Sequence, residues 1–213
     1  MPPKRNYQKE MEKTLERLAG TRPKLLLHTC CAPCSSYVLS YLMQYFDITV
    51  DFYNPNIAPQ AEYDHRRAEL ARLIGEMPHA GAITVLESDY DARVFADAVR
   101  GLEKEKEGGA RCAVCFRLRL EHAAQEAARM GADFFTTTLT ISPHKDAALL
   151  NGLGQEIAAA HGLNYLCSDF KKRNGFKESI ALSEQYHLYR QDYCGCVYSR
   201  QEREEQKRGE GQA

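Results

Sequence analysis

Seven of the eight cysteines in this chain of 213 residues fall into three tight groups that lie far apart in sequence. A chain of this length can bury a core large enough to fold without cross-links, so the grouping needs a chemical explanation. Clustered cysteines typically bind a metal or an iron–sulfur cluster, or exchange electrons. The first thiol group is Cys30, Cys31 and Cys34, the second is Cys112 and Cys115, and the third is Cys194 and Cys196, whereas Cys167 stands alone.

The second thiol group lies at positions i and i+3 near the start of a helix expected over residues 112–130. Both sulfurs can therefore face one point, and the positive end of the helix dipole favours thiolate over thiol. A thiolate is the form that binds a metal. The alternative is that both are small core residues, since free cysteine is commonly buried. Two grouped sets of thiols make metal binding the stronger interpretation.

The first thiol group offers three sulfurs within five residues. Spacing alone favours Cys31 and Cys34, joined to the second thiol group. Four sulfurs suit either tetrahedral zinc or an iron–sulfur cluster, and spacing does not separate the two. The extra sulfur is surplus for a closed zinc site and favours a reactive centre.

The third thiol group has Gly195 between its two cysteines. A disulfide across one residue closes a small, strained ring that should be reduced easily, and glycine supplies the backbone freedom. Two further metal ligands are the alternative. We favour a redox pair because the other groups already supply enough sulfurs for one centre, and we expect Cys167 to be a core residue.

Strand and helix patterns alternate along most of the chain, which predicts an α/β fold. We expect a doubly wound, mostly parallel sheet (Rossmann-like, HUP-type) with helices on both faces. Ligands bind such sheets beyond the carboxyl ends of the strands. Strands are expected near 24–28, 48–52, 82–86, 133–137 and 164–167, and helices near 7–19, 35–46, 70–77, 89–102, 112–130, 145–161 and 178–189. Polar or thiol residues follow four of these strands, so four strand ends should converge on one edge.

Twenty-eight basic and 29 acidic residues give a formal net charge of −1. The chain therefore lacks a general positive field for nucleic acid, and any RNA contact must come from a local patch. No apolar run approaches the roughly 20 residues that cross a membrane, and the start lacks a secretory signal. We expect a cytoplasmic protein, in which structural disulfides are rare. We also expect one domain over residues 1–200, with a helix appended within 1–22 and a charged, disordered tail over 201–213.

Six segments, taken together and in this order, resemble the QueH-type epoxyqueuosine reductases across about residues 24–200. They are LLHTCCAPCS (26–35), FYNPNI (52–57), RCAVCFRLRL (111–120), TTTLTISPHKD (136–146), DFKK (169–172) and LYRQDYCGCVYS (188–199). The joint pattern is very specific, although the N-terminal helix and the charged tail lie outside it.

The resemblance implies removal of the epoxide oxygen from epoxyqueuosine at the tRNA wobble base, as the last step of queuosine formation. It implies a [4Fe–4S] cluster on Cys30, Cys31, Cys112 and Cys115, and a redox-active pair in Cys194 and Cys196. Its partners would be tRNA and an unidentified electron donor. Because vicinal residues normally point apart, Cys34 is kept as the reserve ligand in place of Cys30, or as a ligand of an additional iron ion.

Deoxygenation of an epoxide takes two electrons and two protons. We expect an iron centre to act as Lewis acid and electron donor, with the third thiol group resupplying electrons. His144, Tyr193 and Asp169 are candidate proton donors, and His144 and Asp169 are also candidate ligands of a second metal. RNA contact is expected from a basic and aromatic patch, with base recognition by a separate turn. The patch is Lys171, Lys172, Arg173, Lys177, Phe170, Phe176 and Arg190, and the turn is Tyr53, Asn54 and Asn56.

Two other functions compete with this interpretation. One is a zinc-stabilised α/β module that binds RNA without catalysis. The other is a nucleotide-activating tRNA thiolase on a similar sheet. That class requires a glycine-rich phosphate loop after the first strand, whereas residues 28–34 contain no glycine.

Overall fold

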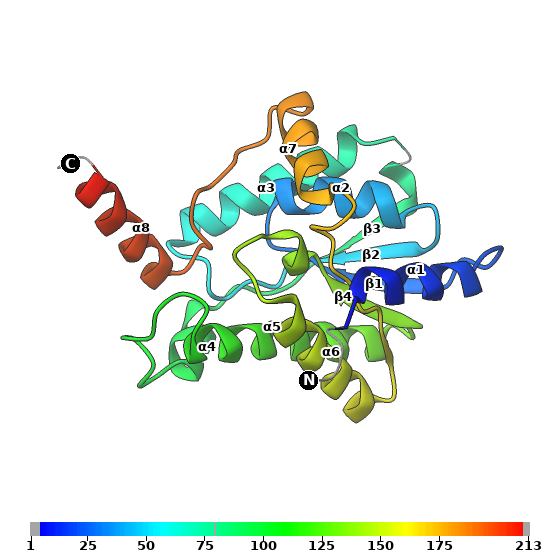
Figure 1. Ribbon diagram of the computed structural model, residues 1–213, viewed down its shortest axis with the longest axis horizontal. Helices are drawn as coiled ribbons and strands as arrows, with labels where there is room; N and C mark the ends of the chain where they lie inside the picture. Colours follow the sequence, from blue (N-terminus) through cyan, green and yellow to red (C-terminus); the bar gives the residue numbers. More distant parts are fainter. Residues whose placement is uncertain (1–4, 79, 211–213) are drawn as a thin grey trace.

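The computed structural model describes residues 5–78 and 80–210. Five strands form one sheet in the order β3-β2-β1-β4-β5, and every neighbouring pair is parallel (Figure 1). The strands are β1 (Lys24–His28), β2 (Asp47–Asp51), β3 (Ile83–Leu86), β4 (Phe134–Thr137) and β5 (Asn164–Tyr165). The predicted α/β class and the parallel sheet are confirmed.

The central strand β1 carries the run Leu25-Leu26-Leu27, and all three side chains are fully buried. Leu25 and Leu27 pack into one hydrophobic cluster, whereas Leu26 packs into another. A strand that is covered on both faces has a continuous apolar sequence, as parallel strands commonly have. The central position of β1 follows from this pattern.

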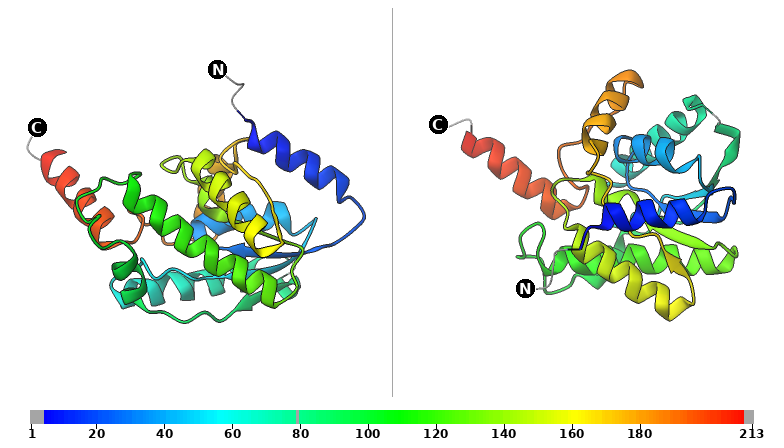
Figure 2. Two further views of the ribbon diagram at one scale, coloured as in Figure 1. Left: turned by 90° about the horizontal axis from the view of Figure 1, so that it is seen from below. Right: turned by 45° about the vertical axis from the view of Figure 1, so that its right-hand side comes forward.

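Helices cover both faces of the sheet (Figures 1 and 2). On one face, α1, α2 and α3 contribute to the cluster that contains Leu25, and α7 packs on α2. On the other face, α5 and α6 form the cluster that contains Leu26. The helices are α1 (Tyr7–Arg17), α2 (Ala32–Leu42), α3 (Gln60–Glu76), α4 (Ala92–Ala98), α5 (Ala110–Arg129), α6 (Ala147–His161), α7 (Gly175–Gln185) and α8 (Val197–Glu210), with short 3₁₀ turns η1 (Ala80–Ala82) and η2 (Thr138–Ile141).

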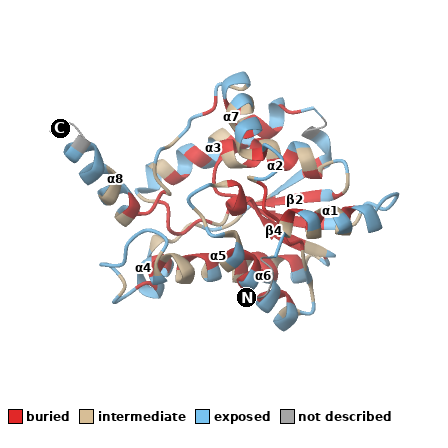
Figure 3. Cartoon of the chain, viewed as in Figure 1, coloured by how far each residue is buried: buried red, intermediate tan, exposed pale blue. Residues whose placement is uncertain are grey.

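The carboxyl ends of the strands lead into buried segments (Figure 3). Thr29 and the first two cysteines follow β1, Asn54–Asn56 follows β2, and η2 follows β4. Thr29 N donates to Asp51 O at 2.8 Å, which extends the β1–β2 ladder beyond the last strand residue. The predicted convergence of strand ends on one edge is thus observed.

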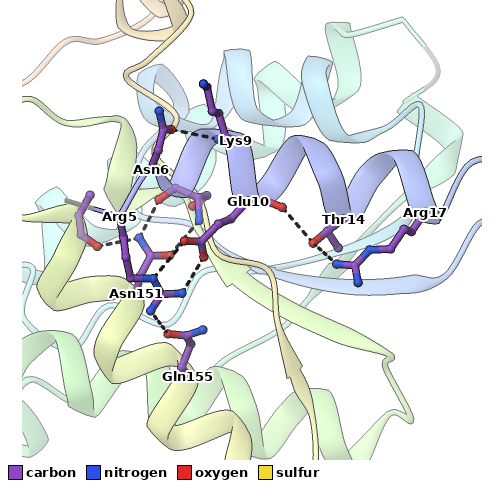
Figure 4. Close-up of polar contacts among 10 residues, drawn as sticks. Arg5, Asn6, Lys9, Glu10, Thr14, Arg17, Asn151 and Gln155 are labelled. Atoms are coloured by element: carbon purple, nitrogen blue, oxygen red, sulfur yellow. Dashed lines mark hydrogen bonds and ion pairs between the residues drawn. The ribbon is translucent and has the colours of Figure 1, made fainter. Parts of the chain in front are cut away.

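Helix α1 is held at its start by polar contacts (Figure 4). Asn6 Oδ1 accepts a hydrogen bond from Lys9 N at 3.0 Å, which caps the helix. Arg5 donates to Glu10 within the same segment and to Gln155 of α6. The expected N-terminal helix is therefore present and is fastened to the helical layer beside it.

The charged tail was expected to be disordered, and this expectation is wrong for the part that the structure describes, since α8 continues to Glu210. Arginine, glutamate, glutamine and lysine are good helix formers, and Arg200 pairs with Glu204 one turn later. Lys207 pairs with Asp192 outside the helix at 2.6 Å. Residues 211–213 of the expected tail lie outside the described residues. Of the helices that are described, none is long and apolar enough to cross a membrane.

Candidate functional site

The first thiol group occupies the turn between β1 and α2. Cys31 is the N-cap of α2, and its Sγ accepts a hydrogen bond from Cys34 N at 3.4 Å. The Sγ atoms of Cys30 and Cys31 lie 4.0 Å apart, and all three sulfurs lie within 4.8 Å of one another. Extended backbone at Cys31, with φ −168° and ψ 157°, lets these vicinal thiols converge. Across residues 5–78 and 80–210, this is the one group of three or more metal-binding side chains packed this closely.

One thiol of this group is far more acidic than the others. Hydrogen bonds with Cys31 and Cys34, followed by the nearby positive charges, hold the pKa of Cys30 well below its usual value. The same interaction with Cys30, together with burial, raises the pKa of Cys31 to about 12. Close packing of the three sulfurs thus moves their pKa values in opposite directions.

The second and third thiol groups line a common buried void of about 10 Å³. Cys112 and Cys115 enter it from the first turns of α5, and Cys194 and Cys196 enter it from the segment before α8. Cys112 also packs against the hydrophobic cluster that contains Cys30 and Cys31. The three thiol groups, which are distant in sequence, thus meet at the same rim of the sheet.

The helix dipole was expected to favour thiolate in the second thiol group, but burial has the larger effect. Removal from water raises the pKa of Cys112 and raises that of Cys115 to about 12. Burial likewise raises the pKa of Cys196. A metal that binds these sulfurs would have to offset the cost of burying their thiolate forms.

Arg119 lies beneath the sulfurs and is fully buried. Its Nη1 donates to Asn56 Oδ1 at 2.9 Å, whereas Nε and Nη2 have no hydrogen-bond partner. Within the described part of the chain, no carboxylate forms an ion pair with it. Burial opposes its charge, but the sulfurs of Cys115 and its neighbours raise the pKa of Arg119 above the usual value. An unpaired buried cation is costly, so this arrangement fits an anionic group at the sulfurs.

A cleft of about 730 Å³ opens from the rim to the surface. Cys30 and Cys34 of the first thiol group and Cys194 of the third thiol group all line it. Cys194 therefore borders both the open cleft and the buried void, whereas Cys196 borders only the void. The remaining walls of the cleft come from the loop before α5, from residues 141–145, from α7 and from the segment leading into α8.

Two buried arginines hold the segment that carries the third thiol group. Arg66 of α3 pairs with Glu62, donates from Nη1 to Cys194 O at 3.2 Å and lies over the ring of Tyr193. Arg111 of α5 pairs with Glu202 of α8 at 2.9 Å and also donates to the carbonyl oxygens of the Glu103 and Glu105 loop. Side chains rather than a sheet ladder thus position this segment.

The three candidate proton donors occupy different environments. His144 is exposed on the cleft wall, and Tyr193 also lines the cleft. Asp169 is not among the described residues that line the cleft, and its carboxylate lies 2.7 Å from Lys171 Nζ. The structure therefore brings His144 and Tyr193 to the site but leaves Asp169 outside it.

The expected RNA patch is only partly available. Phe170 is 1% exposed and cannot stack on a base, and Arg173 pairs with Glu12 of α1 at 3.0 Å. Phe176 and Arg190 line the cleft instead. An aromatic residue in a sequence pattern gives no indication of which way its ring points, and here Phe170 belongs to the core.

The turn expected to recognise the base is also buried. Asn54 and Asn56 are each 1% exposed, and both lie within reach of Arg119 Nη1. Asn54 also donates to Thr29 O at 2.8 Å. Tyr53 stacks on His122, with ring centroids 3.7 Å apart. These residues support the rim from below and do not face the cleft, except that Asn56 borders the buried void.

Sequence reasoning missed Arg119 and Lys145. A usable signal existed for Arg119, because it lies four residues after Cys115 and therefore on the same helical face as the second thiol group. Lys145 lines the cleft near Cys30, Cys34 and Cys194, although no spacing rule relates it to them.

Comparison with known proteins gives a consistent result. A family model described as epoxyqueuosine reductase QueH matches residues 25–202. A protein with that name from Streptococcus pyogenes serotype M1 is 48% identical over 193 residues, which cover 89% of this chain and 75% of that protein. Another from Staphylococcus epidermidis is 40% identical over 91% of this chain and 84% of its own length. A third from Thermotoga maritima is 34% identical over 85% of this chain and 92% of its own length.

A solved structure shares the fold. It is the U34-tRNA thiolase NcsA from Methanococcus maripaludis with its [4Fe–4S] cluster. The TM-score is 0.53 with 13% sequence identity, and the match covers 90% of this chain and 67% of that one. At this identity, the likeness concerns the arrangement of helices and strands alone.

Proposed function

This chain belongs to the QueH family of epoxyqueuosine reductases, and we propose that it works with an iron–sulfur centre and a redox-active thiol pair. The chain is an oxidoreductase of tRNA queuosine formation. Its reaction converts the epoxide of epoxyqueuosine at the wobble base to an alkene and releases water. The conversion consumes two electrons and two protons, so the site must hold the substrate and supply both.

The proposed centre is a [4Fe–4S] cluster held by Cys30, Cys31, Cys112 and Cys115. Cysteine thiolates are the usual ligands of such clusters, and a cluster with four thiolates carries net negative charge. The buried, unpaired nitrogens of Arg119 support this assignment, because they supply the opposite charge at the same place. When bound, the cluster would supply one-electron transfer and Lewis acidity.

An additional iron ion remains part of the proposal. Cys30 and Cys31 are assigned to the cluster, and Cys34 is the third sulfur of the same 4.8 Å group. We assign Cys34 to this ion, beside the cluster. His144 lines the same cleft as Cys34 and is a candidate second ligand.

The proposed thiol pair is Cys194 and Cys196. Oxidation of two thiols to one disulfide releases two electrons and two protons, and the epoxide takes up two of each to give the alkene and water. The pair can thus supply one complete turnover, after which an external donor must reduce the disulfide. The observation that carries this role is the position of Cys194, which borders both the substrate-sized cleft and the sulfur-lined void.

The proposed substrate is a tRNA whose modified base enters the cleft. The cleft has the volume of a site for a small ligand. Phe176 offers a ring for stacking on an unstacked base, and Arg190 offers a charge for a phosphate. We therefore place the RNA contact on the α7 side of the cleft.

The decisive experiment is anaerobic purification with iron and sulfide quantified, followed by mass analysis of tRNA nucleosides after incubation with epoxyqueuosine-bearing tRNA. We expect a brown protein that forms queuosine, with iron in excess of sulfide if the additional ion is present. A colourless, zinc-containing protein that binds tRNA without converting it would instead establish the non-catalytic zinc module.

A further inference from the structure

Lys145 is a cation of the cleft whose charge the fold does not use. It lies between η2 and α6, is half-buried and lines the cleft. Among the described residues, no side chain forms a hydrogen bond or an ion pair with its ammonium. The neighbouring carboxylate of Asp146 is turned away into the cap of α6, where it accepts from Ala148 N at 2.7 Å.

Lys145 shares the cleft with sulfur atoms from two segments. Burial opposes its charge, but Cys194, Cys30 and Cys34 raise the pKa of Lys145 above the usual value. These sulfurs belong to the first and third thiol groups, and Cys30, Cys34, Cys194 and Lys145 all line the cleft. A substrate that enters the cleft can therefore meet both the sulfurs and Lys145.

Other charged residues of the cleft have an ion-pair partner or another proposed role. Glu202 pairs with Arg111, and Asp192 pairs with Lys207. Arg190 donates to Ser183 Oγ at 3.0 Å and is assigned to a phosphate of the tRNA. Lys106 is exposed on the loop before α5. Lys145 is thus the cation best placed at the sulfur-lined end of the cleft.

We propose that Lys145 Nζ binds the epoxide oxygen of the substrate and stabilises the negative charge that develops on this oxygen as its bonds to carbon break. This rests on the proposed function. Both electrons and both protons come from the Cys194 and Cys196 thiols, which become a disulfide, and the oxygen leaves as water. Lys145 is charged before and after the step, so it acts as a fixed electrostatic partner.

The test uses the full chain with its metal, and the substitutions Lys145→Met and Lys145→Arg. Two tRNAs are compared: one carries epoxyqueuosine and the other carries queuosine, which lacks the oxygen. Wild type should bind the epoxide tRNA more tightly, and Lys145→Met should abolish this preference. Loss of one such donor lowers kcat by about 10²-fold or more. Lys145→Arg keeps the charge and should retain most of the preference.

Lys106→Met is the matched control, because it removes an exposed lysine charge from the same cleft. This variant should bind both tRNAs more weakly, to a similar extent, and the ratio of the two affinities should stay unchanged. The proposal is overturned if Lys145→Met keeps the wild-type preference, or if its defect is explained by lost iron. If wild type itself forms no queuosine, the proposed function fails. The ratio of the affinities for the two tRNAs still decides whether Lys145 contacts the oxygen.

Discussion

The first and third thiol groups border one cleft, but the fold holds them in different ways. Cys30 and Cys31 extend directly from β1, which is hydrogen-bonded to β2 and β4, and Cys31 begins a helix. Cys194 and Cys196 lie on irregular backbone between α7 and α8. There, the contacts are a few hydrogen bonds, such as Ala58 N to Gly195 O at 3.0 Å. Backbone fixed on both sides suits metal ligands, whereas backbone fastened at a few points suits sulfurs that must approach and separate.

The largest expected effect comes from substituting a cysteine of the first thiol group, which the sheet holds rigidly. Cys31→Ser should lose most bound iron and most queuosine formation, because Cys31 is buried within the first thiol group and is one of the proposed cluster ligands. Iron and sulfide analysis together with absorbance near about 400 nm measures this. Cys167→Ser is the control: Cys167 is also a buried cysteine, its charged neighbours are Glu10 and Arg5, and this variant should keep its iron. Full iron content in Cys31→Ser would contradict the assignment.

The same substitution in the third thiol group should separate iron binding from turnover. Cys196→Ser should retain the iron and the absorbance but stop multiple turnover, since a single thiol cannot close a disulfide. The measurement is queuosine formed per chain with excess reductant, beside iron content. Normal multiple turnover by this variant would remove the dithiol from the mechanism.

Gly195 tests how tightly the third thiol group is constrained. Its φ of +121° is unfavourable for any residue with a Cβ, and a Cβ there would lie 3.0 Å from Ile57 Cγ1 and 3.1 Å from Arg66 Nη1. Gly195→Ala should lower the free energy of unfolding by at least about 1–2 kcal/mol. Gly152→Ala in α6 is the control: its Cβ would meet nothing within 4 Å, and helix propensity predicts a gain of up to about 1 kcal/mol. Chemical denaturation of both variants gives the comparison, and equal stabilities would show that the segment relaxes freely.

The smallest expected effect concerns the two sulfurs of the pair. Cys194 borders the open cleft, whereas Cys196 is buried and its pKa is raised by that burial. In reduced protein at neutral pH, Cys194 should be alkylated faster, by a factor on the order of ten. The difference between the two alkylation rates should narrow as the pH rises, because Cys196 then gains thiolate. Mass analysis of modified peptides over time measures both rates, and faster modification of Cys196 would reverse the roles.

The sequence predicted the sheet well because its signals are local. The apolar run of β1 and the alternation in β2 depend on neighbours along the chain, and both strands were found within a residue or two of their expected bounds. The helical tail was missed because composition alone cannot show that Lys207 and Arg203 have a partner in Asp192.

The candidate site was predicted in its sulfurs but not in its charges. Arg117 and Arg119 are two residues apart on the same helix and look alike in sequence. Arg117 pairs with Glu156 at the surface, whereas Arg119 is fully buried under the thiols. Which arginine is buried depends on how α5 is rotated against the sheet, and that rotation is set by packing across the whole domain. The four-cysteine ligand set and the redox pair stay predictions until iron and disulfide are measured.

The position of α8 has a practical consequence for work with this protein. The helix contributes Glu202 and Gln206 to the cleft wall, and it begins at Val197, directly after Cys196 of the third thiol group. Helix α1, in contrast, contacts α6 through Arg5 and Gln155, near a separate cavity of about 550 Å³ that no cysteine lines. A purification handle should therefore be fused before α1, because one fused after α8 would extend an element that borders the entry route of the tRNA.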